Sequence, residues 1–128
     1  MIFRAIKYQS IPFVITGAGQ TISANNVITD RNYKTVNGIQ AITRDATAMS
    51  GLKVAKFEIN GQEIYPADFD LQLISCGKDV NPNERFDKEV NEPADGSKVD
   101  ISITDGFIIG QVYPYTVNII LRLSNPIK

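Results

Sequence analysis

Apolar and polar residues alternate along Val99-Asp-Ile-Ser-Ile-Thr104, which is followed by the turn dipeptide Asp105-Gly106 and then by Phe107-Ile-Ile-Gly-Gln-Val112. A two-residue Asp-Gly turn between alternating runs is a strong signal for a β-hairpin. Paired across this turn, the apolar residues of the first run meet apolar residues or glycine on one face, while its polar residues point away. The stretch therefore predicts a hairpin with one buried side.

Similar strand-like runs, separated by turn residues, continue through the rest of the chain, and no helical period interrupts them. Asn60-Gly61 joins 52–59 to 62–65 as a second hairpin, with Phe57 opposite Ile64. The pattern predicts about nine strands in all. The other strand-like runs, some of which could join into one strand, are 2–8, 11–15, 21–29, 33–36 and 38–44 on either side of an Asn37-Gly38 turn, 69–76, and 116–123.

The chain has 128 residues, a length that suits one domain with a single core. We expect an all-β, single-domain antiparallel β-sandwich over residues 1–128, interrupted by a long charged loop at 77–98. An immunoglobulin-like sandwich normally carries a core tryptophan and paired cysteines. This chain has no tryptophan and one cysteine, so a jelly-roll topology is preferred.

The residue types present argue against an enzyme. The chain contains no histidine, which removes the most common general base and a frequent metal ligand. Cys76 has neither a histidine nor a second cysteine to activate it. Asp79 to Glu84 places oxygen ligands at alternate positions, but Glu84 and Val90 stand where a calcium loop needs glycine and glutamate. We expect no catalytic residue, no cofactor and no metal site.

The charge and hydropathy of the chain also restrict the kinds of partner that we expect. The net charge is −1, which gives no basic surface for nucleic acid. No run approaches the roughly 18 apolar residues of a transmembrane helix. The apolar part of the first residues is shorter than a signal-peptide core, so secretion by that route is not expected.

Some apolar residues fall on strand faces opposite the expected core. Ile74, Ile109 and Ile120 are predicted to point outward, where neighbouring subunits would cover them. Tyr113 and Tyr115 flank a proline, and this site is either a bend with partly buried rings or an exposed contact patch. Phe86 either anchors the 77–98 loop or meets a partner.

This layout, about eight or nine strands with a long charged loop before the closing strands, resembles that of the small jelly-roll virion proteins of icosahedral, tailless viruses and bacteriophages. Asp105-Gly106 and Tyr113-Pro114-Tyr115 are compatible with the resemblance, which carries over no functional residue. It implies a symmetric assembly, for example five copies at a capsid vertex, and a position in a shell.

We therefore expect a non-enzymatic structural protein, a capsid vertex (penton) or minor capsid protein, that forms homo-oligomers and contacts neighbouring structural proteins in the virion. The alternative is a receptor- or glycan-binding module of a surface fibre, spike or adhesin at the cell surface or outside the cell. Self-assembly distinguishes the first hypothesis, and sugar binding that depends on the 77–98 loop distinguishes the second.

Overall fold

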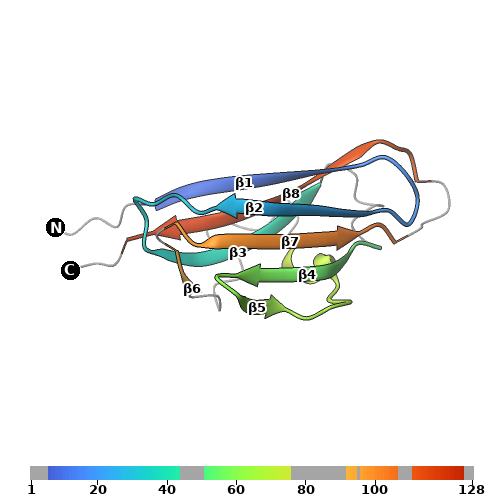
Figure 1. Cartoon of the computed structure of the whole chain (residues 1–128). Coiled ribbons are helices and arrows are strands. Elements are labelled where there is room, and N and C mark those ends of the chain that lie inside the picture. Colours follow the sequence, from blue (N-terminus) through green and yellow to red (C-terminus); the bar gives the residue numbers. More distant parts are fainter. Residues whose placement is uncertain (1–5, 44–50, 76–91, 95, 107–110, 126–128) are drawn as a thin grey trace.

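Two four-stranded antiparallel sheets make up the protein in a computed structural model that describes residues 6–43, 51–75, 92–94, 96–106 and 111–125, with only the backbone at 25 and 26. The sheets have the orders β1-β8-β3-β6 and β2-β7-β4-β5, and Figure 1 shows their strands running along one long axis. The elements are β1 (Ile6–Ile15), β2 (Thr21–Ile28), β3 (Thr35–Thr43), β4 (Lys53–Ile59), β5 (Gln62–Tyr65), the 3₁₀ helix η1 (Leu71–Ile74), β6 (Glu92–Pro93), β7 (Lys98–Thr104) and β8 (Tyr115–Ser124).

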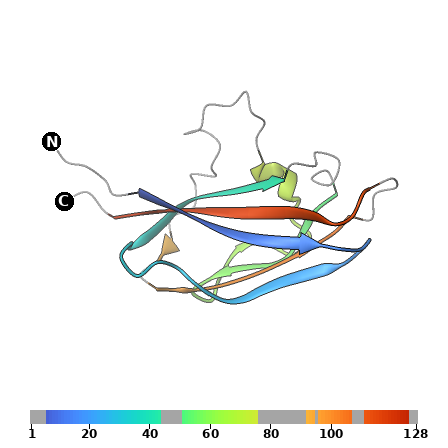
Figure 2. The same ribbon diagram turned by 90° about the horizontal axis from the view of Figure 1, so that it is seen from above.

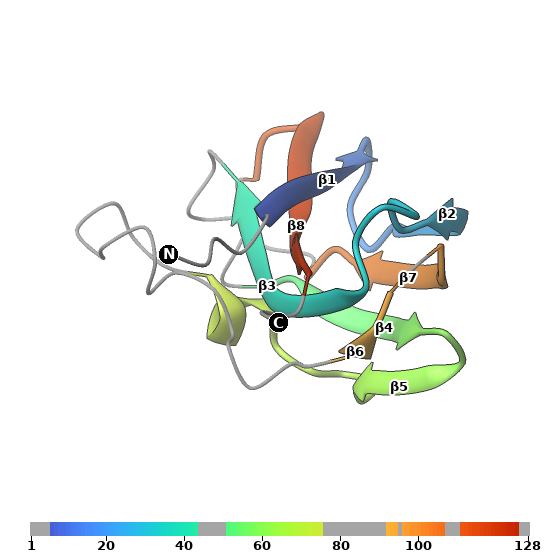
Figure 3. The ribbon, with the colours of Figure 1, turned by 90° about the vertical axis from the view of Figure 1, so that its left-hand side faces the viewer.

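The expected all-β antiparallel sandwich is confirmed. Figure 3 shows the two sheets as layers from one end, and the core lies between them. Because side chains alternate across a strand, every second residue of β7 and β8 is buried. The largest fully buried side chains come from both sheets and are Phe13, Phe57, Ile15, Ile39, Leu52, Ile59, Leu71, Ile101, Ile103, Ile119, Leu121 and Leu123.

The strand pairs are nested. β1 pairs with β8, β2 with β7, β3 with β6, and β4 with β5, as in one long hairpin whose turn is Asn60-Gly61. Two further pairs, β3 with β8 and β4 with β7, roll this hairpin into two sheets. Figure 2 shows the result from above, with β8 lying between β1 and β3.

The hairpin expected at Asp105-Gly106 does not form. β7 is a central strand that pairs with β2 on one side and β4 on the other, so neither of its edges is free for 107–112. Residues 107–110 lie outside the described residues, and Gln111 and Val112 belong to no strand. The apolar alternation of 99–104 correctly indicated a half-buried strand, but alternation does not identify the partner.

Two predicted breaks in strands are also absent. Gln9 and Ser10 continue β1 without interruption, because both pair in register with β8. Asn37-Gly38 is not a turn: β3 runs through it with a register shift between Val36 and Gly38. The extra residue forms a bulge, and Arg122 Nε donates to the Asn37 side-chain oxygen at 3.1 Å.

The hairpin at Asn60-Gly61 is confirmed as β4 and β5, with both turn residues at positive φ. A register shift places Phe57 opposite Tyr65 instead of Ile64. The prediction of a strand at 69–76 is wrong for 69–75, the part of this range that the structure describes. Asp70 accepts a hydrogen bond from the Gln72 amide and caps η1, which replaces the strand.

The C-terminal part of the predicted loop at 77–98 contains a short strand and the beginning of another. Residues 77–91 lie outside the described residues. Glu92 and Pro93 form β6 against β3, Ala94 is buried, and Lys98 begins β7. In the parts that the structure describes, no helix is long and apolar enough to cross a membrane.

Candidate interaction face

The face of β1, β8 and β3 that points away from the core collects exposed apolar side chains. Ile6, Tyr8 and Val14 on β1 are 47%, 54% and 50% exposed, and Ile42 on β3 is 38% exposed. Cross-strand partners share one face of a sheet, so the register defines what we call the β1-β8-β3 outer face. Its residues are Ile6, Tyr8, Ser10, Pro12, Val14, Thr35, Gly38, Gln40, Ile42, Thr116, Asn118, Ile120, Arg122 and Ser124. Gly38, Gln40 and Ser124 are buried, so the exposed part of this face lies mainly on β1.

Charge is scarce on this face. Arg122 is the one charged side chain among its residues, and it donates to the side-chain and backbone oxygens of Asn37. The polar groups near the middle are neutral: Ser10 Oγ donates to Asn118 Oδ1 at 3.3 Å. Depletion of charge together with aliphatic and tyrosine side chains is typical of the centre of a protein interface.

The outer face of the other sheet has the opposite character. Hydroxyl groups pair across β2 and β7, at 2.9 Å between Thr21 and Thr104 and at 2.7 Å between Ser23 and Ser102. Beside them lie two ion pairs, Lys56 with Glu58 and Lys98 with Asp100. A surface of hydroxyls and mixed charges is well hydrated, so it is the less suitable of the two outer faces for packing against protein.

The edge strands in the described residues do not favour sheet extension. β1 contains Pro12, which lacks an amide hydrogen, and β2 has a bulge between Ala24 and Val27. β5 has four residues, and β6 has two, one of them Pro93. Prolines, bulges and short strands are the usual protections against edge-to-edge pairing. A partner is therefore expected on a face of the sandwich and not along an edge.

The structure places the six predicted contact residues in different environments, and not all of them on one surface. Ile120 lies on the β1-β8-β3 outer face and is half-buried between its register partners Ser10 and Gln40. Ile74 is 5% exposed because η1 turns it inward, so the prediction that it points outward is wrong; Leu73 is exposed instead. Ile109 and Phe86 lie outside the described residues.

Asp105 anchors Tyr113 and Tyr115 by accepting a hydrogen bond from each phenol. Tyr115 is buried and donates to Asp105 Oδ1, and half-buried Tyr113 donates to Asp105 Oδ2 at 2.7 Å. The Gly19 amide donates to the same Oδ2 at 3.0 Å. This supports the bend interpretation for the two tyrosines. The hydrogen bond to the Asp105 carboxylate, helped by desolvation, raises the pKa of Tyr113 to about 12.

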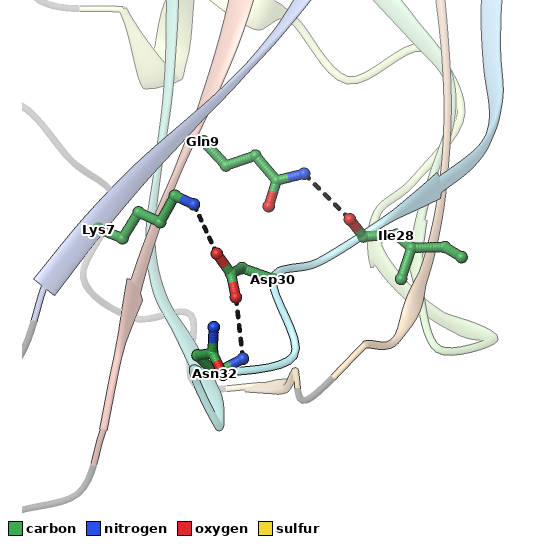
Figure 4. Close-up of polar contacts among 5 residues, drawn as sticks. All are labelled: Lys7, Gln9, Ile28, Asp30 and Asn32. Atoms are coloured by element: carbon green, nitrogen blue, oxygen red, sulfur yellow. Dashed lines mark hydrogen bonds and ion pairs between the residues drawn. The ribbon is translucent and has the colours of Figure 1, made fainter.

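A polar corner joins the two sheets where β1 lies beside β2 (Figure 4). Lys7 pairs with Asp30 at 2.5 Å, and Gln9 Nε2 donates to the Ile28 carbonyl at 3.1 Å. The hydrogen bond from Lys7 to Asp30 raises the pKa of Lys7 and lowers the pKa of Asp30. The hydrogen bond that the Asn32 amide donates to Asp30 lowers the pKa of Asp30 further. This corner ties β1 to the β2–β3 connection.

Sequence reasoning missed the contribution of β1 and β3 to the outer face. It divided β1 at Gln9-Ser10, which hid the alternation of Tyr8, Pro12 and Val14 with the buried Ile11, Phe13 and Ile15. Reading residues 6–15 as one strand would have revealed the apolar outer side.

Among the described residues, no group of three or more histidine, cysteine, aspartate or glutamate side chains is arranged to hold a metal ion. Comparisons with protein-family models, with curated proteins and with solved structures found no match to this chain.

Proposed function

We propose that this protein is a non-enzymatic building block of a symmetric assembly, a virion component such as a capsid vertex or minor capsid protein, that works through contacts with copies of itself and with neighbouring structural proteins. The observation that carries the proposal is the group of exposed apolar side chains on the nearly uncharged β1-β8-β3 outer face, Ile6, Tyr8, Val14 and Ile42. A monomer gains nothing from exposing such a face, and a neighbour that covers it removes apolar surface from water.

The nested strand order supports the same proposal. Pairing of β1 with β8, β2 with β7, β3 with β6 and β4 with β5 is what a jelly roll requires, with two sheets made of two Greek keys. Viral capsid proteins are among the proteins that use this topology.

Sedimentation velocity and light scattering of the purified chain over a wide concentration range test the proposal. We expect the mass to rise with concentration toward a closed oligomer, because one shared interface repeated by symmetry gives defined assemblies. A protein that stays monomeric at millimolar concentration would contradict it.

The receptor- or glycan-binding alternative also has support, since lectin domains share the jelly-roll order. Deletion of residues 80–94 would test it, although the deletion also removes β6 and buried Ala94 and therefore needs a folding control by circular dichroism. Glycan-array binding by the intact chain, lost in a folded deletion variant, would favour the alternative. An intact chain that binds no sugar and associates with itself would favour the building block.

A further inference from the structure

We infer that Asn60, at the tip of the hairpin of β4 and β5, is a site of spontaneous deamidation in the folded protein, and that the fold protects the second Asn-Gly dipeptide, Asn37-Gly38. The inference does not depend on the proposed function. Asparagine precedes glycine at these two places in the sequence and at no other. A following glycine favours the reaction, because it has no Cβ to hinder attack on the asparagine side chain and adopts many backbone angles at little cost.

The reaction joins atoms of the dipeptide itself, and water is its co-reactant. The backbone nitrogen of Gly61 bonds to Cγ of Asn60 while the bond from Cγ to Nδ2 breaks. The leaving nitrogen departs as ammonia, with the proton that the Gly61 nitrogen has lost through solvent. Water then opens the cyclic imide at Cγ to give aspartate, or at the backbone carbonyl carbon to give isoaspartate. Nothing is oxidised or reduced.

The tip of the hairpin leaves the reacting atoms accessible. Asn60 and Gly61 are exposed, with φ angles of 54° and 77°, and nothing lies within 4 Å of a Cβ built on Gly61. Ile59 and Gln62 form the last cross-strand pair, so the two turn residues lie outside the ladder. The Asn60 amide donates to the Lys98 carbonyl at 2.8 Å, but the attacking nitrogen is that of Gly61. Ring closure therefore needs only a local rearrangement of an exposed turn.

The same dipeptide is fixed in place within β3. Arg122 Nε donates to the Asn37 side-chain oxygen at 3.1 Å, and Arg122 Nη2 donates to the Asn37 backbone oxygen at 3.4 Å. Gly38 is buried and pairs with Arg122 across the sheet. Ring closure at Asn37 would require the bulge and both hydrogen bonds to open. The reaction there must proceed from a rarely populated open state.

The two products should differ in their effect on the hairpin. Asp-Gly suits the same two-residue turn as Asn-Gly, so aspartate at position 60 should preserve the register of β4 and β5. Isoaspartate adds a methylene group to the backbone of the turn, and the length of the turn sets the register. β5 is a four-residue edge strand that contributes Tyr65 to the core. It is the element that isoaspartate should loosen.

Ageing the purified chain at mildly alkaline pH tests the inference, because base removes the amide proton and speeds ring closure. Peptide mapping by mass spectrometry measures the deamidation of each dipeptide, and an isoaspartyl methyltransferase labels isoaspartate. We expect Asn60 to react at least about tenfold faster than Asn37 in the folded chain. In guanidinium chloride, which unfolds both sites, the two rates should become similar. Arg122→Ala should raise the rate at Asn37 and leave the rate at Asn60 unchanged.

The folded and unfolded wild type decide the inference even if Arg122→Ala fails to fold. Equal rates at the two asparagines in the folded chain would overturn the protection of Asn37. An Asn60 that reacts only after unfolding would overturn the accessibility of the turn. Neither result bears on self-association, which sedimentation measures separately.

Asn60→Asp is the control for the products. The isoaspartate fraction of the aged chain, separated by chromatography, should show faster amide hydrogen exchange in β5 than the wild type. Asn60→Asp should exchange like the wild type. Equal exchange in β5 for all three proteins would contradict the loosening of this strand.

Discussion

Tyr115 donates its phenolic hydrogen bond to the carboxylate of Asp105, and both residues are buried at the end of the sandwich where β7 finishes and β8 begins. The same carboxylate accepts hydrogen bonds from the Tyr113 hydroxyl and the Gly19 amide. One side chain therefore joins β7, the bend before β8, and the connection between β1 and β2. A buried carboxylate can be tolerated at this place because its oxygens have partners.

Replacing Asp105 by asparagine should destabilise the protein. The amide keeps the size of the side chain, but it removes the charge and replaces one accepting oxygen with an NH2 group, which then faces a phenol that donates. We expect a loss of about 2 kcal/mol in the free energy of unfolding, measured by urea denaturation. Asp100→Asn, on the hydrated outer face of the other sheet, is the control and should change little. Equal effects of the two variants would contradict the role given to Asp105.

Tyr113 should make the protein sensitive to alkali. Its pKa of about 12 in the folded state lies above the ordinary value of 10.0, so folding stabilises the protonated phenol. This contribution is fully present below about pH 10 and is lost as the pH rises toward 12. We expect Tyr113→Phe to reduce the slope of stability against pH in this interval. Phenolate absorbance of the wild type should include a late-titrating component that is lost in Tyr113→Phe.

Gly106→Ala should be strongly destabilising. A Cβ at this position would lie 2.1 Å from the Gly51 carbonyl oxygen and 2.4 Å from its Cα, and backbone atoms cannot move aside cheaply. We expect a loss of about 3 kcal/mol in thermal or urea unfolding. Gly17→Ala is the matched control, because nothing lies within 4 Å of a Cβ built there. If Gly106→Ala unfolds like Gly17→Ala, the close approach to Gly51 is incorrect.

Pro12→Thr should promote association along the edge of the sheet. Threonine suits a strand and restores an amide hydrogen to the free edge of β1. We expect unfolding stability similar to that of the wild type but faster aggregation, followed by light scattering and thioflavin fluorescence. Thr116→Val, on the neighbouring strand β8 at an exposed outward position, is the control for an increase in β-propensity alone. Unchanged aggregation of Pro12→Thr would show that Pro12 does not protect this edge.

Local patterns predicted most of the strands but fewer of their partners. Alternation in 99–104 and 116–123 identified β7 and β8, because each strand has one buried face. Asn60-Gly61 identified the hairpin of β4 and β5, because its positive φ angles suit the turn. Asp105-Gly106 has the same kind of signal, yet Asp105 is committed to the two tyrosines and β7 is already paired on both sides.

The candidate face was only partly predictable, for the same reason. Ile120 could be placed because the alternation of β8 is regular. Ile74 could not, since the capping bond from Gln72 to Asp70 turns an expected strand into η1 and exchanges the faces of Leu73 and Ile74. Asn37 lies in a bulge of β3, where its side-chain oxygen accepts a hydrogen bond from Arg122, a residue distant in the sequence. Long-range contacts of this kind override local turn propensity.

The nested pairing has a consequence for how the protein is made. Ile6 pairs with Ser124, so β1 cannot join its sheet until β8 has left the ribosome. The hairpin of β4 and β5 is the pairing that closes the shortest loop, and strands outside it must then find partners at growing separations. We therefore expect slow folding that begins at the hairpin of β4 and β5, and nascent chains that keep the apolar side of β1 exposed until β8 has emerged.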